Sequence, residues 1–332
     1  MKFSGSRHVW RLASSFPREL DVLWEVVTGV AERAALTTDG ALHLEPSAAG
    51  EPHASLDVLP LVAAGTLEAG FTAGSFFMAQ DPVLALQTFV PFGLDHRRHY
   101  AWLTGPGRDH AEAAWARAGV VALPCANTGA QMGGWFREPI AGTADFRGLR
   151  IRTAGLPALV LARLGAEVRQ LPAEAIIPAL AAGELDAADW IGPHDDARMG
   201  FVAHAPYYHH PGVLEPSAQL SLIVNAGRWA ELRPGEQAAL RAVCAEAGAR
   251  VLARYDLLNP PALEELERAG ARLVRFPDTV VAALRRATRE VLVELAGANP
   301  EFGRALASYE AFAAAGRRWA ALGEGAAAGL VG

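Results

Sequence analysis

The residue best suited to recognise a charged ligand is Arg152. It ends the segment 148–152, where alternation puts Leu149 and Ile151 on one face of a predicted strand and Arg150 and Arg152 on the other. A guanidinium presents a planar fork of donors that matches a carboxylate at two points. We therefore predict that Arg152 binds an anionic ligand, the alternative being an ordinary arginine on the surface of a strand.

A polar, glycine-rich segment at 127–135 could surround the same ligand. It carries Asn127 and Gln131, whose amides both donate and accept hydrogen bonds, as recognition of a hydroxy or keto acid requires. Its glycines allow the backbone to approach a ligand closely. The segment is predicted to contribute to a binding site, and a plain polar loop is the alternative.

Two further segments bring acidic and aromatic groups. Asp189 and Trp190 follow a predicted strand, and Glu215 lies shortly before another. A carboxylate, an amide oxygen and a backbone carbonyl are hard oxygen ligands, which suit Na⁺ or Ca²⁺ better than zinc. These residues thus suggest a cation site.

The elements that must position these residues alternate between strands and amphipathic helices, which indicates an α/β protein. Phe76 and Phe77 illustrate the arrangement, since they follow a helix over 56–65 and a strand over 67–72, at the strand end where open α/β sheets bind ligands. Further strands are predicted at 9–14, 41–46, 119–123, 167–171, 185–191, 219–225 and 272–276, with helices at 21–35, 157–165, 173–183, 236–257, 261–269, 279–296 and 300–322. The last helix carries an aromatic stripe that fits either core packing or a dimer surface.

Composition and motifs exclude several classes of function. The 332 residues carry 30 Lys and Arg against 36 Asp and Glu, a net charge of −6, with no clustered basic surface for nucleic acid. No apolar run approaches the roughly 20 residues that span a bilayer. The signatures of common enzyme classes are missing. Two cysteines are too few for a disulfide framework, and the histidines at 194, 204, 209 and 210 fit no standard metal spacing.

The amino-terminal residues bear on location. Residues 1–7 contain no apolar stretch of the kind that a secretory signal needs. Either an export segment was removed or wrongly assigned, or the protein stays inside the cell, and the sequence leaves both open.

Taken together, four motifs resemble the DctP-type binding subunits of tripartite ATP-independent periplasmic (TRAP) transporters, in particular the branch that binds 2-oxo acids, lactate and similar monocarboxylates. The resemblance runs from about Trp10 to about Trp319. The four motifs are, in order, 127–136, 145–152, 190–193 and 207–216.

The resemblance implies two α/β lobes joined by hinge strands and a long helix, with a helical carboxyl-terminal part. It places residues 8–124 mostly in the first lobe, 125–225 mostly in the second lobe and hinge, and 226–332 in the helical part. It further implies that Arg152 forms a salt bridge with the ligand carboxylate, and that Gln131, the Trp190 carbonyl and Glu215 hold Na⁺ or Ca²⁺. Some family members dimerise through the last helix.

The expected function is therefore to capture a small organic carboxylate, namely a 2-oxo or 2-hydroxy monocarboxylate, without catalysis. The protein is expected to do so in the periplasm and to deliver the ligand to TRAP membrane subunits. A ligand sensor that needs no transporter is the alternative. The branch usually has a tyrosine pair where this chain has Phe76 and Phe77, and Glu-Trp where it has Asp189 and Trp190. These departures leave the identity of the acid open and favour a more apolar one.

Overall fold

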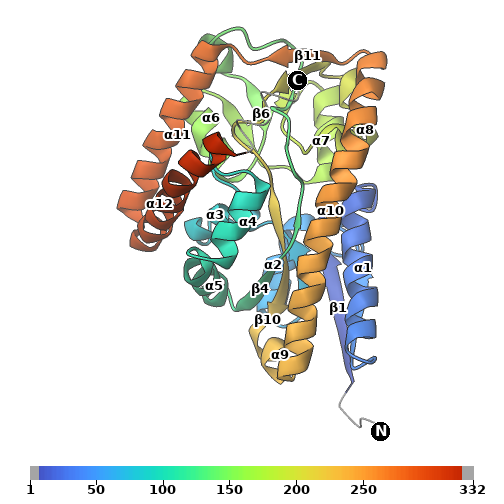
Figure 1. Ribbon diagram of the computed structural model, residues 1–332. Helices are drawn as coiled ribbons and strands as arrows, with labels where there is room; N and C mark the ends of the chain where they lie inside the picture. The colour runs from blue at the N-terminus through green and yellow to red at the C-terminus, as the bar shows by residue number, and fades with distance from the viewer. Residues whose placement is uncertain (1–6, 324–332) are drawn as a thin grey trace.

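The computed structural model describes residues 7–323, and its strands form two separate sheets, one in each of two lobes (Figure 1). Helices cover both sheets, so the predicted two-lobed α/β fold is confirmed. No helix within residues 7–323 combines the length and apolar character needed to cross a bilayer.

The first lobe is built on a five-stranded sheet of order β2-β1-β3-β10-β4. Strand β1 pairs in parallel with β2 and β3, whereas β10 runs antiparallel to its neighbours β3 and β4. The chain therefore returns to this sheet after passing through the second lobe. The strands are β1 (His8–Ser14), β2 (Leu42–Ser47), β3 (Ala69–Thr72), β4 (Val120–Asn127) and β10 (Gln219–Asn225).

The second lobe is built on a six-stranded sheet of order β11-β9-β5-β8-β6-β7. Strand β6, which ends at Arg152, pairs in parallel with β7 and β8, and β5 runs antiparallel to β8 and β9. The strands are β5 (Trp135–Phe136), β6 (Arg150–Arg152), β7 (Glu167–Arg169), β8 (Ala187–Ala188), β9 (Tyr207–His210) and β11 (Arg272–Arg275).

Twelve α-helices lie within the described part of the chain. The predicted helices are present, but α3, α4, α5, α8 and α9 were not predicted. The helices are α1 (Asp21–Thr37), α2 (Val58–Ala63), α3 (Ala85–Thr88), α4 (His96–Thr104), α5 (Arg108–Arg117), α6 (Gly155–Arg163), α7 (Ala173–Ala181), α8 (Pro193–Met199), α9 (Ala226–Glu231), α10 (Pro234–Arg268), α11 (Asp278–Ala298) and α12 (Pro300–Leu322). Five 3₁₀ turns add η1 (Ser55–Asp57), η2 (Gly74–Phe77), η3 (Pro82–Leu84), η4 (Thr143–Phe146) and η5 (Phe201–Ala203).

The long helix α10 runs alongside both lobes (Figure 1). The prediction of two helices separated near Pro260 and Pro261 is wrong, because both prolines lie inside one helix. Their missing N–H groups leave the carbonyls of Asp256 and Leu257 without helical donors, but these residues are exposed and water can replace the bonds. Buried positions on both sides of the prolines keep the helix packed.

Two strand predictions also need correction. Strand β4 does not end at Leu123 but continues to Asn127, because β10 pairs with it along its whole length. The strand predicted over 185–191 contains only two ladder residues, Ala187 and Ala188.

The pair α11 and α12 forms another connection between the lobes. Helix α11 packs on α6 of the second lobe, and α12 packs on α4 and α5 of the first. Tyr309 of α12 fixes this contact, since its hydroxyl accepts a hydrogen bond from the Leu94 amide at 2.6 Å and its ring meets Trp102 edge-on. The first half of the aromatic stripe is therefore core, whereas Trp319 is 73% exposed.

Candidate functional site

A cavity of about 70 Å³ lies between the lobes, where strands of both sheets end. A water molecule needs roughly 10–15 Å³ by the same measure, so the space accommodates a small organic molecule. Segments that follow β1, β3, β4, β6, β7 and β8 all line it, as does the segment before β10. This is the strand end at which open α/β sheets bind ligands.

Arg152 is buried at the end of β6 and lines this cavity. Its Nε donates to the Leu171 carbonyl at 3.2 Å and its Nη1 to the Asp189 carbonyl at 2.9 Å. Burial lowers the pKa of Arg152, while the nearby carboxyls of Asp189 and Glu215 act to raise it. The described structure thus holds a desolvated cation in a fixed orientation at the cavity wall.

Trp190 packs against Arg152 and completes this wall. The guanidinium carbon of Arg152 lies 4.9 Å from the centroid of the indole ring, within the range of a cation–π contact. The indole Nε1 is buried and has no hydrogen-bond partner. An orphaned buried donor costs free energy, so the cavity is suited to a ligand that accepts a hydrogen bond there.

Side-chain oxygen atoms gather at or beside the same cavity, and one of them has no donor. Gln131 donates from Nε2 to the Thr128 hydroxyl at 2.8 Å, but its buried Oε1 has no partner. Glu215 lies within hydrogen-bonding reach of Asp189, and burial raises the pKa of both carboxyls, that of Asp189 to about 6. Two half-buried carboxyls and an unpaired amide oxygen form a set of hard ligands that fits Na⁺ or Ca²⁺.

The structure brings together most of the residues singled out in the sequence. Arg152, Gln131, Trp190, Glu215 and Phe76 all line the cavity. Asp189 does not, but its backbone carbonyl orients Arg152 and its carboxyl faces Glu215.

Two of the predicted ligand contacts lie elsewhere. Phe77 is buried in the hydrophobic core and does not line the cavity, and its ring lies edge-on to that of Phe76 with 6.5 Å between the centroids. Asn127 ends β4, where its Oδ1 accepts the Gly129 amide at 2.9 Å and its Nδ2 faces Gln219. Its amide therefore fixes the conformation of the 127–135 segment and does not itself line the cavity.

Several polar residues of the cavity were not predicted. Ser15 follows β1 and donates to the Ser55 carbonyl at 2.7 Å, and Thr88 accepts the Ser75 amide at 2.9 Å. The sequence could have predicted Ser15 as a cavity residue, because it directly follows a strand whose end is expected to face a ligand. Ser55, Ser75, Thr88, Thr128 and Gln170 also line the cavity.

Within the described residues, no two of the histidines at 194, 204, 209 and 210 belong to one group of possible metal ligands. His209 is fully buried, stacks on Phe276 and accepts the Ile140 amide at 3.2 Å. Burial lowers the pKa of His209 to about 4, so its ring is neutral at physiological pH.

Residues 14–298 match the family model of bacterial extracellular solute-binding proteins, family 7, or DctP. The chain belongs to this family. The DctP-family protein is thus a solute-binding protein and not an enzyme, in agreement with the missing catalytic motifs.

A monocarboxylate 2-oxoacid-binding periplasmic protein of Nostoc sp. (strain PCC 7120) is 37% identical to the DctP-family protein over 304 residues, which cover 91% of this chain and 83% of the relative. A TRAP transporter solute-binding protein from Bordetella bronchiseptica RB50, a dimer with calcium and picolinate in one site, matches with a TM-score of 0.96 and 34% identity over 98% of each chain. A TRAP periplasmic solute-binding protein from Pseudoalteromonas atlantica T6c with sodium and pyruvate has a TM-score of 0.93 and 29% identity, covering 97% of this chain and 98% of that one.

Proposed function

We propose that this protein captures a small 2-oxo or 2-hydroxy monocarboxylate between its lobes and delivers it to the membrane subunits of a TRAP transporter. The observation that carries the proposal is the buried guanidinium of Arg152 at the cavity wall. Two backbone carbonyls hold Arg152 in place, but neither carries the full negative charge that would neutralise it. A ligand carboxylate supplies that charge.

The enclosed position strengthens this contact. Opposite unit charges 4 Å apart attract by about 1 kcal/mol in bulk water and about 4 kcal/mol at an effective dielectric constant of 20. Arg152 and Glu215 are the one basic and the one acidic side chain among the described residues that line the cavity. A single guanidinium favours a monocarboxylate over a dicarboxylate.

The rest of the wall supports a ligand with an apolar body. Leu56, Phe16, Phe76 and Phe89 line the cavity from the first lobe. Pyruvate and picolinate, found in two similar structures, each join one carboxylate to a neighbouring oxygen or nitrogen acceptor. This pattern fits a 2-oxo acid better than a sugar acid, whose many hydroxyls would need more polar partners.

We further propose that Gln131, the Trp190 carbonyl and Glu215 hold Na⁺ or Ca²⁺ beside the ligand. The unpaired Oε1 of Gln131 and the close pair of half-buried carboxyls, Asp189 and Glu215, support this assignment. When bound, the cation would supply positive charge to the carboxylate and acceptor atom of the ligand.

Partners and location follow from the family. Two similar structures are solute-binding proteins of TRAP transporters, which favours a transporter partner over a sensor without one. Two of the similar proteins are periplasmic, and we propose a periplasmic location for this chain. The division into lobes over 8–124 and 125–225, with a helical part over 226–332, also remains a proposal. We propose in addition a homodimer through α12, whose Trp319 and Leu322 are 73% and 68% exposed.

The proposal is tested by native mass spectrometry and calorimetry on the purified protein. Pyruvate and lactate should bind with 1:1 stoichiometry in the presence of Na⁺ or Ca²⁺, and succinate should bind at least about tenfold more weakly, because its second carboxylate finds no cationic partner. Tight succinate binding, or no binding of any 2-oxo acid with either cation, would overturn it.

A further inference from the structure

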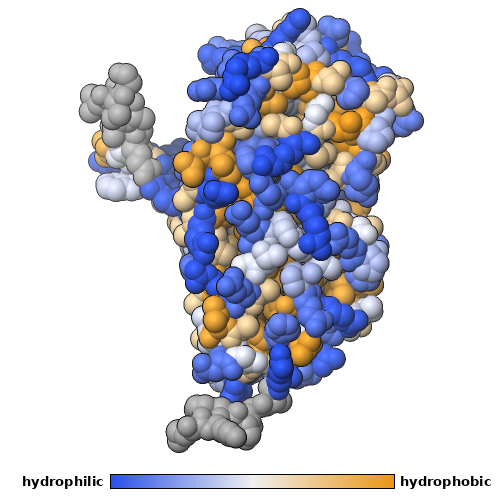
Figure 2. Space-filling view, turned by 90° about the vertical axis from the view of Figure 1, so that its right-hand side faces the viewer, coloured by the Kyte–Doolittle hydropathy of each residue, from blue (hydrophilic) through white to orange (hydrophobic). Residues whose placement is uncertain are grey.

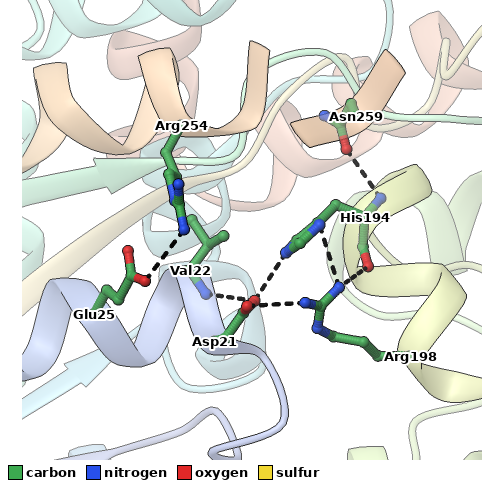
Figure 3. Close-up of polar contacts among 7 residues, drawn as sticks. All are labelled: Asp21, Val22, Glu25, His194, Arg198, Arg254 and Asn259. Carbon is green, nitrogen blue, oxygen red and sulfur yellow. Dashed lines mark hydrogen bonds and ion pairs between the residues drawn. The ribbon is translucent and has the colours of Figure 1, made fainter. Parts of the chain in front are cut away.

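A group of charged side chains joins the two lobes outside the cavity (Figure 3). Asp21, at the start of α1, accepts from two residues of α8. The Nε2 atom of His194 lies 2.8 Å from one carboxylate oxygen, and Nη2 of Arg198 lies 2.9 Å from the other. Arg198 also donates to the His194 carbonyl at 3.0 Å, which ties the two α8 residues together.

Helix α8 is fixed to the second lobe by Asp196. The buried carboxylate of Asp196 accepts from Trp135 Nε1 of β5 at 2.8 Å and from the Tyr208 hydroxyl of β9 at 2.7 Å. Both partners belong to the six-stranded sheet. His194 and Arg198 are therefore anchored to the second-lobe sheet, and the His194 amide in addition donates to Asn259 Oδ1 of α10 at 3.0 Å.

Helix α1 is fixed to the first lobe. Its buried residues Leu23 and Val27 share a hydrophobic core with Trp10 of β1 and Leu222 of β10. Asp21 therefore moves with the first lobe, and the contact in Figure 3 crosses between the lobes. It also lies next to the site, because Leu23 and Ile191 both line the cavity.

The chemistry of this group favours an ion-pair cluster. Although burial acts to raise it, the His194 hydrogen bond and the charges of His194 and Arg198 hold the pKa of Asp21 below its usual value. Oxygen and nitrogen atoms of Asp21, His194 and Asp195 lie within 4.8 Å of one another, as in some metal sites. However, the Arg198 guanidinium binds the same carboxylate, and its charge opposes a cation there.

Solvent reaches part of this cluster. The side chains of Asp21 and Arg198 are 39% and 37% exposed, whereas that of His194 is 8% exposed. The face that carries α1 and α8 is mostly hydrophilic (Figure 2). Contacts of this kind can form and break at modest cost, because water satisfies the separated groups.

We propose that Asp21, His194 and Arg198 form an interlobe clasp that stabilises the closed lobes and slows ligand release without touching the ligand. They are positioning residues, since they act by holding the walls of the cavity together. The effect on ligand release rests on the proposed function, whereas the effect on lobe opening does not.

The test compares Asp21→Asn and Arg198→Gln with Glu25→Gln as a matched control. Glu25 lies one turn further along α1 and pairs with Arg254 of α10 at 3.5 Å (Figure 3). The control substitution therefore removes an ion pair of α1 but leaves the contacts between α1 and α8 intact. In stopped-flow experiments both clasp variants should release pyruvate about fivefold faster, a typical effect of a partly exposed ion pair. The double variant should add little to either single change, because the two residues share one interaction.

A second readout needs no ligand. Hydrogen–deuterium exchange of the cavity segments 128–131 and 152–154 should be faster in both clasp variants than in the control, because the lobes open more often. If the wild type binds no 2-oxo acid, the proposed function fails and this measurement still tests the clasp. Exchange in both variants that matches the Glu25→Gln control would overturn the clasp, as would unchanged release of pyruvate.

Discussion

The guanidinium of Arg152 lies over the ring of Trp190, with 4.9 Å between the guanidinium carbon and the ring centroid. The same guanidinium donates to the Leu171 and Asp189 carbonyls. Its orientation is thus fixed by the second lobe alone, before the lobes close on a ligand. Such preorganisation reduces the entropy lost on binding, and it makes Arg152 the first residue to test.

Arg152→Ala should weaken pyruvate binding at least about thirtyfold without unfolding the protein, because truncating one partner of a buried charge pair costs about 2–5 kcal/mol. Arg152→Lys should recover only part of the loss, since an ammonium cannot reproduce the planar fork. Calorimetry measures both. Arg150→Gln is the matched control, because Arg150 lies two residues earlier and pairs with Asp186 instead. Unchanged affinity in Arg152→Ala would remove this residue from the site.

Glu215→Gln should lower affinity about tenfold or more and abolish its dependence on Na⁺ or Ca²⁺, because the substitution keeps the shape but removes the anionic ligand. The wild type should show a similar loss after dialysis against chelator in sodium-free buffer. The exposed Glu138→Gln serves as the control for a lost surface charge. A variant that keeps both its affinity and its cation dependence would refute the assignment of Glu215.

Gly155→Ala should impair lobe closure. Gly155 opens α6 with a φ of +62°, and an added Cβ would lie 3.0 Å from Cβ of Ser75 in the other lobe. Gly183→Ala is the control, since Gly183 has a φ of +71° and open space around its Cα. Both variants should lose about 1 kcal/mol of stability from backbone strain, but only Gly155→Ala should lose affinity. Equal affinities in the two variants would argue against a contact at this point.

Acidification should destabilise the protein through His99. This ring is completely buried beside the Leu86 carbonyl, and burial lowers its pKa to about 4. The unfolded chain binds a proton near pH 6.5 and the folded one does not, so stability falls as the pH drops from 6.5 toward 4, by up to about 3 kcal/mol. Denaturant titrations at pH 7.5 and 5 should show a smaller difference for His99→Gln than for the wild type. His110→Gln, on the surface helix α5, should retain the full difference.

Trp319→Glu should yield a monomer if α12 mediates the proposed homodimer. Trp319 is 73% exposed, and a charge there would oppose burial against a second copy. Light scattering after size exclusion measures the mass. Phe312, on the same helix but partly buried against the chain's own core, is not part of this surface. A wild-type protein that is monomeric at high concentration would contradict the dimer.

The sequence predicted those parts of the site that depend on local pattern. Arg152 could be placed because alternation and residue type are local properties, and Trp190 and Glu215 because they lie in two of the four motifs that carry the family resemblance. The different environments of Phe76, at the cavity, and Phe77, in the core, could not be predicted, since they depend on how the 3₁₀ turn η2 packs against other segments. The continuity of α10 was missed for a similar reason. Local propensity ends a helix at Pro260, but contacts with both lobes and solvation of the freed carbonyls outweigh that propensity.

Strand β10 lies between β3 and β4, and this arrangement constrains how the chain folds as it is made. Until residues 219–225 are available, β3 and β4 each lack a neighbour, and the first sheet stays incomplete although most of its strands have been synthesised. Such distant pairing slows folding and leaves sheet edges open to aggregation in the meantime.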